Sequence, residues 1–182
     1  MVRICLLVRV ISFALSIANE ILNPQNIIAT TIEIDNISTF TKRNITELIN
    51  LGATVHLGID GAQIDKIFQG YKFDNVIFQF PNTGNIQSIE GRHSNCILLR
   101  DFLSSAKPLL ANNGKVIVTI VDSPYYQGAF QIEEVAKTTG YNNIEFYSFD
   151  INEYPNYIHT MTTQNKSVLN RSDKFQTIVF SV

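Results

Sequence analysis

The chain has 182 residues, of which 45% are hydrophobic and 16% are charged, so it is long enough to bury a core and is not an intrinsically disordered chain. Its net charge is −2 and it has no run of Lys or Arg, which excludes a protein that holds a long nucleic acid through an extended basic face. Its two cysteines and three widely separated histidines do not have the spacing of a metal cluster.

Apolar, β-branched runs recur along the chain and predict seven strands, over residues 3–10, 26–34, 53–59, 73–80, 115–121, 143–149 and 174–182. Helical spacing predicts helices over residues 12–22, 38–51, 62–68, 92–111 and 131–139. The helix over residues 92–111 is expected to bend or break near its end at Pro108. The helix after Asn36 or Ser38 is expected to turn Ile45, Leu48 and Ile49 inward and to end at Gly52. Asn112, Asn113 and Gly114 predict a turn.

Strands alternate with helices until the last two strands, which have no clear helix between them. Two strands without a crossover helix pair antiparallel. The pattern therefore predicts an α/β, Rossmann-like, doubly wound fold, with a mostly parallel seven-stranded sheet and a reversed terminal strand. The chain has no repeat, low-complexity tract or linker, so we expect a single domain over residues 1–182.

The carboxyl ends of central strands are where an open parallel sheet binds ligands. The apolar run at residues 73–80 predicts a strand that is buried on both of its faces. This run ends in a polar, turn-forming segment, Gln79–Gly84. Acids also follow two neighbouring strands: Glu33 and Asp35 after the second, and Asp60 after the third. Such carboxylates can accept hydrogen bonds from a ribose and an adenine amino group, which predicts an adenosine site. Taken singly, each acid is better explained as a helix N-cap or a solvated loop residue, whereas their occurrence on adjacent strand ends favours neither interpretation. The segment is equally explained as a plain turn.

Seven segments occur in a fixed order along the chain: SFALSIA (12–18), ATTIEID (29–35), GIDGAQI (58–64), FDNVIFQFPNTG (73–84), LLRDFLSSAKPLLANNGKVIVTI (98–120), SPYYQGAFQIEEVAKTTGY (123–141) and YPNYIHTMT (154–162). Together they resemble the large-subunit ribosomal RNA (uracil-N3) methyltransferase-like family. The similarity covers nearly the whole chain up to Thr163. Each segment is weak alone, but the ordered series is specific.

The resemblance implies a Rossmann-like enzyme that uses S-adenosylmethionine to methylate a uracil N3 in ribosomal RNA. It implies cofactor contacts from Ser12, Phe13, Glu33, Asp35, Asp60, Phe80 and Pro81. We expect Gln79 and Asn82 to hold the edge of the base, and His159 to accept a proton near neutral pH. Alternatively, His159 anchors the aromatic segment Tyr154–Tyr157.

The acidic net charge implies that any RNA contact is small or is completed by a partner protein. No membrane association is expected, because apart from the N-terminal apolar stretch no segment approaches the length of a membrane span. The implied location is intracellular, in the cytoplasm or, in a eukaryote, the nucleolus.

The chain departs from the family pattern at the expected ligand loops. The glycine-rich loop before the first helix is replaced by a shorter Arg9–Ile11, and F-N-F-P-H becomes Phe78–Asn82. These changes support a second hypothesis, a non-catalytic Rossmann-like binding module. The first 20 residues also resemble a cleavable signal peptide. The third hypothesis is therefore a secreted protein that is cleaved after Ala18. Cleavage after Ala18 would remove the first strand and the first helix.

Overall fold

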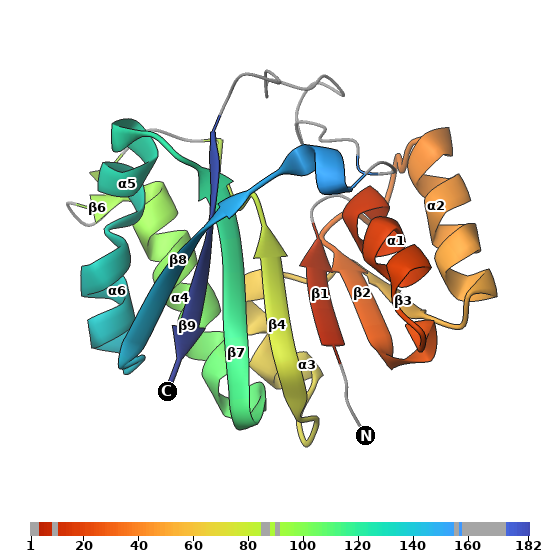
Figure 1. The fold of residues 1–182 in the computed structure, drawn as a ribbon, viewed down its shortest axis with the longest axis horizontal. Helices are drawn as coiled ribbons and strands as arrows, with labels where there is room; N and C mark the ends of the chain where they lie inside the picture. Colours follow the sequence, from red (N-terminus) through yellow and green to blue (C-terminus); the bar gives the residue numbers. More distant parts are fainter. Residues whose placement is uncertain (1–3, 9–10, 85–87, 90–91, 155–156, 158–173) are drawn as a thin grey trace.

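A seven-stranded sheet forms the centre of the protein in the computed structural model (Figure 1). The structure describes residues 4–8, 11–84, 88–89, 92–154, 157 and 174–182. The strands of this sheet are β1 (Ile4–Val8), β2 (Ile27–Thr31), β3 (Thr54–Leu57), β4 (Phe73–Gln79), β7 (Leu110–Val121), β8 (Asn143–Phe149) and β9 (Phe175–Ser181). A separate antiparallel hairpin consists of β5 (Ser88–Ile89) and β6 (Arg92–His93).

The strand order is β3-β2-β1-β4-β7-β9-β8. The strands from β3 to β7 pair in parallel, whereas β9 is antiparallel to both β7 and β8. The sheet is therefore mixed and contains the expected reversed strand. That strand is the last in the chain, but it lies between β7 and β8 and not at the edge of the sheet. The carboxyl ends of β1, β2, β4 and β7 all lie at the upper edge in Figure 1.

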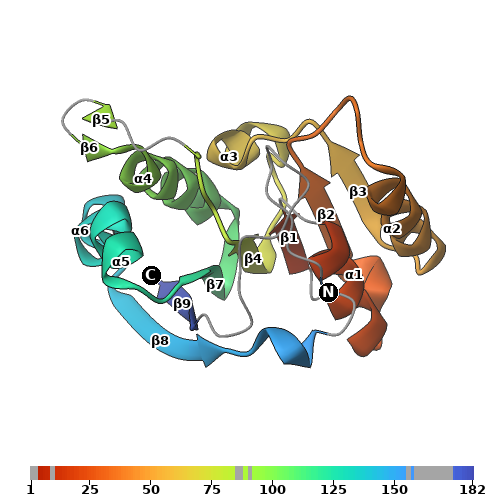
Figure 2. The same ribbon diagram turned by 90° about the horizontal axis from the view of Figure 1, so that it is seen from above.

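Helices cover both faces of the sheet (Figure 2). They are α1 (Ile11–Glu20), α2 (Thr39–Asn50), α3 (Ile64–Ile67), α4 (Ser94–Ala106), α5 (Pro124–Phe130) and α6 (Ile132–Thr139). The helices α1 and α2 pack on one face, and α3, α4 and α6 pack on the other. None of the helices in the described ranges is both long and apolar enough to cross a membrane.

Each face of the sheet has its own apolar core. The core under α3, α4 and α6 is centred on fully buried aromatic rings, including Phe73, Phe102, Phe130 and Phe180. The core under α1 and α2 combines smaller aliphatic residues with aromatic residues near the carboxyl edge. Burial of this extent supplies most of the free energy that holds a sheet of this kind together.

Some helices begin or end at residues other than the predicted ones. The helix predicted over residues 92–111 ends at Ala106 and is followed by a 3₁₀ turn at Lys107–Leu109, so it breaks at Pro108 as expected. The helix predicted over residues 131–139 is preceded by α5, and Gln131, with φ of 48°, separates α5 from α6. In α2, Ser38 is the N-cap and Leu48 is fully buried, but Ile49 is 55% exposed, so its predicted inward position was wrong.

The turn predicted at Asn112–Gly114 is an irregularity within β7. Asn113 has φ of 63°, and the register between β4 and β7 shifts between Phe73 and Asn75. A Cβ atom at Gly114 would lie 2.8 Å from the carbonyl oxygen of Phe73. The bulge therefore needs glycine at this position because two backbones approach closely.

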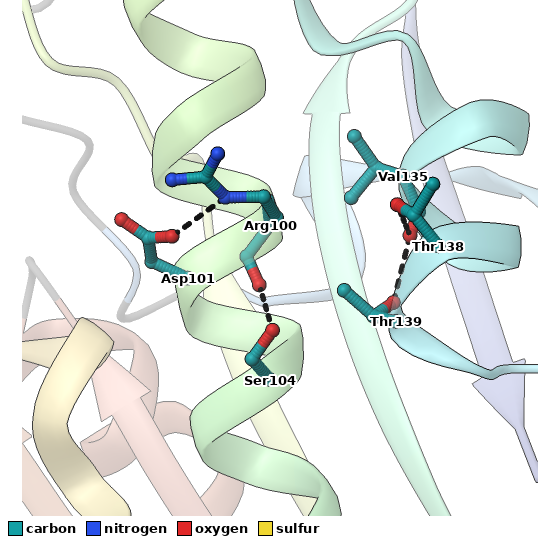
Figure 3. Close-up of polar contacts among 6 residues, drawn as sticks. All are labelled: Arg100, Asp101, Ser104, Val135, Thr138 and Thr139. Atoms are coloured by element: carbon teal, nitrogen blue, oxygen red, sulfur yellow. Dashed lines mark hydrogen bonds and ion pairs between the residues drawn. The ribbon is translucent and has the colours of Figure 1, made fainter.

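Hydroxyl groups on α4 and α6 bond to their own helix (Figure 3). Ser104 Oγ donates to the carbonyl oxygen of Arg100 at 2.8 Å. Thr139 Oγ1 and Thr138 Oγ1 donate to the carbonyl oxygen of Val135 at 2.7 Å and 3.0 Å. Polar side chains on these helices therefore find local partners, as Ser and Thr commonly do in helices.

Candidate active site

A cavity of about 260 Å³ opens at the carboxyl ends of three parallel strands, β2, β3 and β4, of which β2 and β4 lie on either side of β1. It is lined by Thr30, Thr31, Ile32, Ile59, Asp60, Gly61, Phe78, Asn82, Thr83 and Leu98. Its volume is slightly below the roughly 300–1,000 Å³ that is typical of small-molecule sites. The walls are mostly apolar, with a few polar groups, which is the usual composition of such a site.

Asp60 lines this cavity and also caps the 3₁₀ turn Gly61–Gln63. Its Oδ1 accepts a hydrogen bond from the backbone N–H of Ala62 at 2.9 Å, and its Oδ2 accepts one from Gln63 Nε2 at 3.3 Å. The side chain is only half-buried. Each carboxylate oxygen has two lone pairs, so Asp60 can cap the turn and still accept a further hydrogen bond from a ligand. The cap and the acceptor interpretations are thus compatible.

The other two predicted acids, Glu33 and Asp35, do not line the cavity. The reason is that β2 ends at Thr31, three residues earlier than predicted, so Thr30 and Thr31 occupy the strand end. Beyond it the chain runs beside the segment that follows β3, since the carbonyl oxygen of Glu33 accepts a hydrogen bond from Gly58 N at 3.2 Å. The hydroxyl groups of Thr30 and Thr31 therefore occupy the part of the cavity wall where carboxylates were predicted.

The segment after β4 has a strained backbone and is held in place by hydrogen bonds. Phe80 has φ of 49°, an uncommon value for a bulky residue, which costs of order 1–3 kcal/mol. Pro81 is buried, and Asn82 is half-buried in the cavity wall, where its Oδ1 accepts a hydrogen bond from Gly84 N at 3.0 Å. Strain of this kind persists where the surrounding structure fixes it, and it is commonest at functional sites.

Polar groups at the start of α4 hold this segment in place. Asn95 Oδ1 accepts hydrogen bonds from both the backbone N and Oγ1 of Thr83 at 3.0 Å, and Thr83 Oγ1 lies 2.8 Å from Ser94 Oγ. His93 Nδ1 caps α4 by accepting from Asn95 N at 3.1 Å. These residues were not among those predicted for the site, although His-Ser-Asn before an apolar helix is a recognisable N-terminal pattern.

Gln79 lies at the end of β4, on the opposite face of the sheet from Phe78. Its side chain is 2% exposed, and neither its Nε2 nor its Oε1 has a hydrogen-bond partner among the described residues. Its neighbour on β7 is Thr119, which is equally buried and lies beside Thr177 of β9, with 3.1 Å between the two Oγ1 atoms. A polar row therefore crosses three strands on the face that α1 covers.

Six aromatic residues, here called the aromatic cluster, lie at the carboxyl edge on the same face: Phe13, Phe80, Phe149, Tyr154, Tyr157 and Phe175. Phe13 of α1 lies 5.0 Å from Tyr154 and 5.4 Å from Tyr157, measured between ring centroids. The rings of Phe80 and Tyr157 are parallel within 3°, with centroids 6.2 Å apart. Burial raises the pKa of Tyr157 well above its ordinary value, so its hydroxyl stays protonated at neutral pH.

Five of the predicted site residues fall into two groups. Asp60 and Asn82 lie at the cavity. Phe13 and Phe80 belong to the aromatic cluster, and Gln79 is on the same face of the sheet. Ser12 is buried in α1, and Pro81 is buried beside Phe80; neither lines the cavity. His159 lies outside the described residues.

A family model described as rRNA (uridine-N3-)-methyltransferase BTM5-like matches residues 11–161. The chain belongs to this BMT5-like family. The family resemblance deduced from the ordered segments is therefore confirmed. A comparison with curated proteins gives no match for this BMT5-like chain.

Solved structures with a similar fold include methyltransferases of low sequence identity to this chain. The delta-N METTL16 MTase domain has a TM-score of 0.62 at 11% identity, covering 100% of this chain and 74% of that one. Human methyltransferase 10 domain containing protein has a TM-score of 0.62 at 12% identity, covering 100% and 72%. The 30S ribosomal A1408 methyltransferase from an uncultured bacterium has a TM-score of 0.55 at 11% identity, covering 98% and 87%. The BMT5-like chain therefore has the α/β methyltransferase fold, with a mixed sheet.

Proposed function

We propose that the protein is an S-adenosylmethionine-dependent methyltransferase that methylates N3 of a uracil in ribosomal RNA. Membership of the BMT5-like family supports the reaction and the uracil target. The observation that carries the proposal is the cavity at the carboxyl ends of β2, β3 and β4, the edge at which a sheet of this topology binds nucleotides.

The cavity suits the adenosine part of the cofactor. Ile59, Phe78 and Leu98 offer apolar surface for an adenine ring, and Asp60 offers a carboxylate acceptor for hydroxyl or amino groups. The hydroxyl groups of Thr30 and Thr31 add further polar partners. We propose that Asp60 supplies the strongest single interaction, because a hydrogen bond to an ionised acceptor is roughly twice as strong as a neutral one.

When bound, S-adenosylmethionine supplies an electrophilic methyl group on a sulfonium. The protein must then hold the uracil with N3 in line, and that nitrogen must lose its proton, because its lone pair forms the new bond to carbon as the carbon–sulfur bond breaks. We propose that Gln79 and Asn82 hold the base edge and that His159 accepts the proton. A base inside a duplex would first have to leave its stack.

We also propose that the RNA contact is small or is completed by a partner protein, since the chain has a net charge of −2. A ribosomal RNA substrate places the protein inside the cell, in the cytoplasm or, in a eukaryote, the nucleolus.

One observation favours a second candidate function, a non-catalytic binding module. In the sequence, Arg9 and Val10 lie between Val8 of β1 and Ile11 of α1, and neither is glycine. A connection at this position normally needs glycine where backbone approaches a cofactor. This candidate predicts that neither S-adenosylmethionine nor S-adenosylhomocysteine binds.

Isothermal titration of S-adenosylmethionine into wild-type protein and Asp60→Asn tests the proposal. We expect saturable binding by the wild type and about 10-fold weaker binding by the variant, because it loses one charge-assisted hydrogen bond. Asparagine still caps a helical turn through Oδ1, so the variant should keep its fold. Glu33→Gln is the matched control, because Glu33 is an acid at the same edge that does not line the cavity. Equal affinity of wild type and Asp60→Asn would contradict the assignment of Asp60.

A further inference from the structure

Gln79, Thr119 and Thr177 stand in register on three adjacent strands. Gln79 of β4 pairs with Thr119 of β7, and Thr119 pairs with Thr177 of β9. Their neighbours one position away, Phe78, Val118 and Ile178, all belong to the core under α4. Side chains alternate along a strand, so the three polar side chains share the opposite face, near the aromatic cluster.

The hydrogen-bonding capacity of this row is largely unused. Gln79 has two N–H donors and one carbonyl acceptor, and none of them has a partner among the described residues. In the Thr119–Thr177 pair one hydroxyl donates to the other. Neither hydroxyl has a further hydrogen bond within the described part of the chain, so this pair keeps one O–H free to donate. The row therefore offers an amide N–H and a hydroxyl O–H on neighbouring strands.

Such an arrangement is costly for folding. A buried polar group without a partner costs about 1–3 kcal/mol, and more than 90% of buried polar groups in proteins have a partner. The cost contrasts with the hydroxyls of α4 and α6, which bond to their own helices. An unpaired amide at the carboxyl end of the central strand is understandable when a ligand completes its bonds.

We propose that this row binds the N3 edge of the target uracil and stabilises its deprotonated form. The inference rests on the proposed function and assigns it two further substrate-contacting residues, Thr119 and Thr177. An N–H of Gln79 donates to one carbonyl oxygen beside N3, and the free hydroxyl of the threonine pair donates to the other.

The chemistry of uracil matches these donors. Two carbonyl oxygens flank N3, and their separation is close to the distance between neighbouring strands, about 4.8 Å. When N3 loses its proton to a base, the negative charge spreads over both oxygens. Preorganised donors at those two positions stabilise the anion, as oxyanion-hole donors do, and lower the pKa of the nitrogen that attacks the methyl carbon. The nitrogen–carbon bond then forms while the carbon–sulfur bond breaks.

The double variant Thr119→Val/Thr177→Val tests the proposal, because it removes both hydroxyls with little change of volume. We expect kcat/KM for methyl transfer to RNA to fall about 100-fold, as when one oxyanion-hole donor is lost. The pH at which the rate is half-maximal should move upward, because the uracil N3 becomes less acidic in the site. Calorimetric affinity for S-adenosylmethionine should stay unchanged.

Thr119→Ser/Thr177→Ser is the matched control, since it keeps both hydroxyls and should keep the wild-type pH profile. A second readout is the side-chain amide resonance of Gln79 in the wild type, which should shift on addition of a uridine oligonucleotide. Wild-type kinetics and pH profile in the valine variant, or an unshifted Gln79 amide at saturating oligonucleotide, would overturn this inference alone. A wild type that neither binds the cofactor nor transfers methyl groups would overturn the proposed function, and this inference with it.

Discussion

Gln79→Met is expected to give a protein that is more stable than the wild type and inactive in methyl transfer. The amide of Gln79 is 2% exposed and unpaired among the described residues, whereas methionine is similar in length and has no strong polar group to bury. Removing an unsatisfied buried amide should raise the free energy of unfolding by about 1–3 kcal/mol. Chemical denaturation measures this change.

Activity should move in the opposite direction. Without the amide, the edge of the base has one donor fewer, and we expect kcat/KM to fall at least about 100-fold while affinity for S-adenosylmethionine is retained. Gln176→Met is the matched control, because Gln176 is also a strand glutamine but is only half-buried and pairs with Ile120 of β7 and Ser148 of β8, on the opposite face of the sheet from Gln79. It should change neither property appreciably. A Gln79→Met protein that is less stable, or that keeps wild-type activity, would contradict the role assigned to the amide.

Phe102→Ala should cause the largest loss of stability. Phe102 of α4 is fully buried, and its ring lies 4.7 Å from that of Phe78, measured between centroids. A Phe→Ala change in such a core removes transfer free energy and leaves a cavity, at a cost of about 3–5 kcal/mol. That is a large part of the roughly 5–15 kcal/mol by which a domain is stable, so the melting temperature should fall markedly.

The same substitution should weaken the cofactor site, because Phe78 lines the cavity and Phe102 supports it from behind. Phe102→Leu keeps most of the volume and should lose much less stability. Phe40→Ala is the surface control, since Phe40 of α2 is 43% exposed. A Phe102→Ala protein within about 1 kcal/mol of the wild type would contradict the packing of this core.

Much of the fold could be predicted from local patterns. Apolar, β-branched runs located all seven strands of the sheet, and Ser38 and Gly52 were recognised at the two ends of α2. Pro108 correctly indicated where the helix α4 breaks, whereas the end of β2 was predicted three residues too late. The position of β9 between β7 and β8 is a pairing over a long sequence distance, which local patterns do not determine.

The sequence predicted the location of the candidate site better than the residues that form it. Asp60 and Asn82 were expected at strand ends and do line the cavity. Glu33 and Asp35 were chosen because a carboxylate suits a ribose, but the early end of β2 places Thr31 there instead. Gln79 was named from the polar segment after β4. Its unpaired amide depends on which strands lie beside it, and a single sequence does not show this.

Methyl transfer to ribosomal RNA, followed by analysis of the nucleosides, tests the central claim most directly. Purified protein is incubated with ribosomal RNA and S-adenosylmethionine that carries an isotope-labelled methyl group. The RNA is then digested to nucleosides for mass spectrometry. We expect label in 3-methyluridine with the wild type, and at least about 100-fold less with Gln79→Met. Label in another nucleoside, or no transfer by a protein that binds the cofactor, would contradict the proposed function.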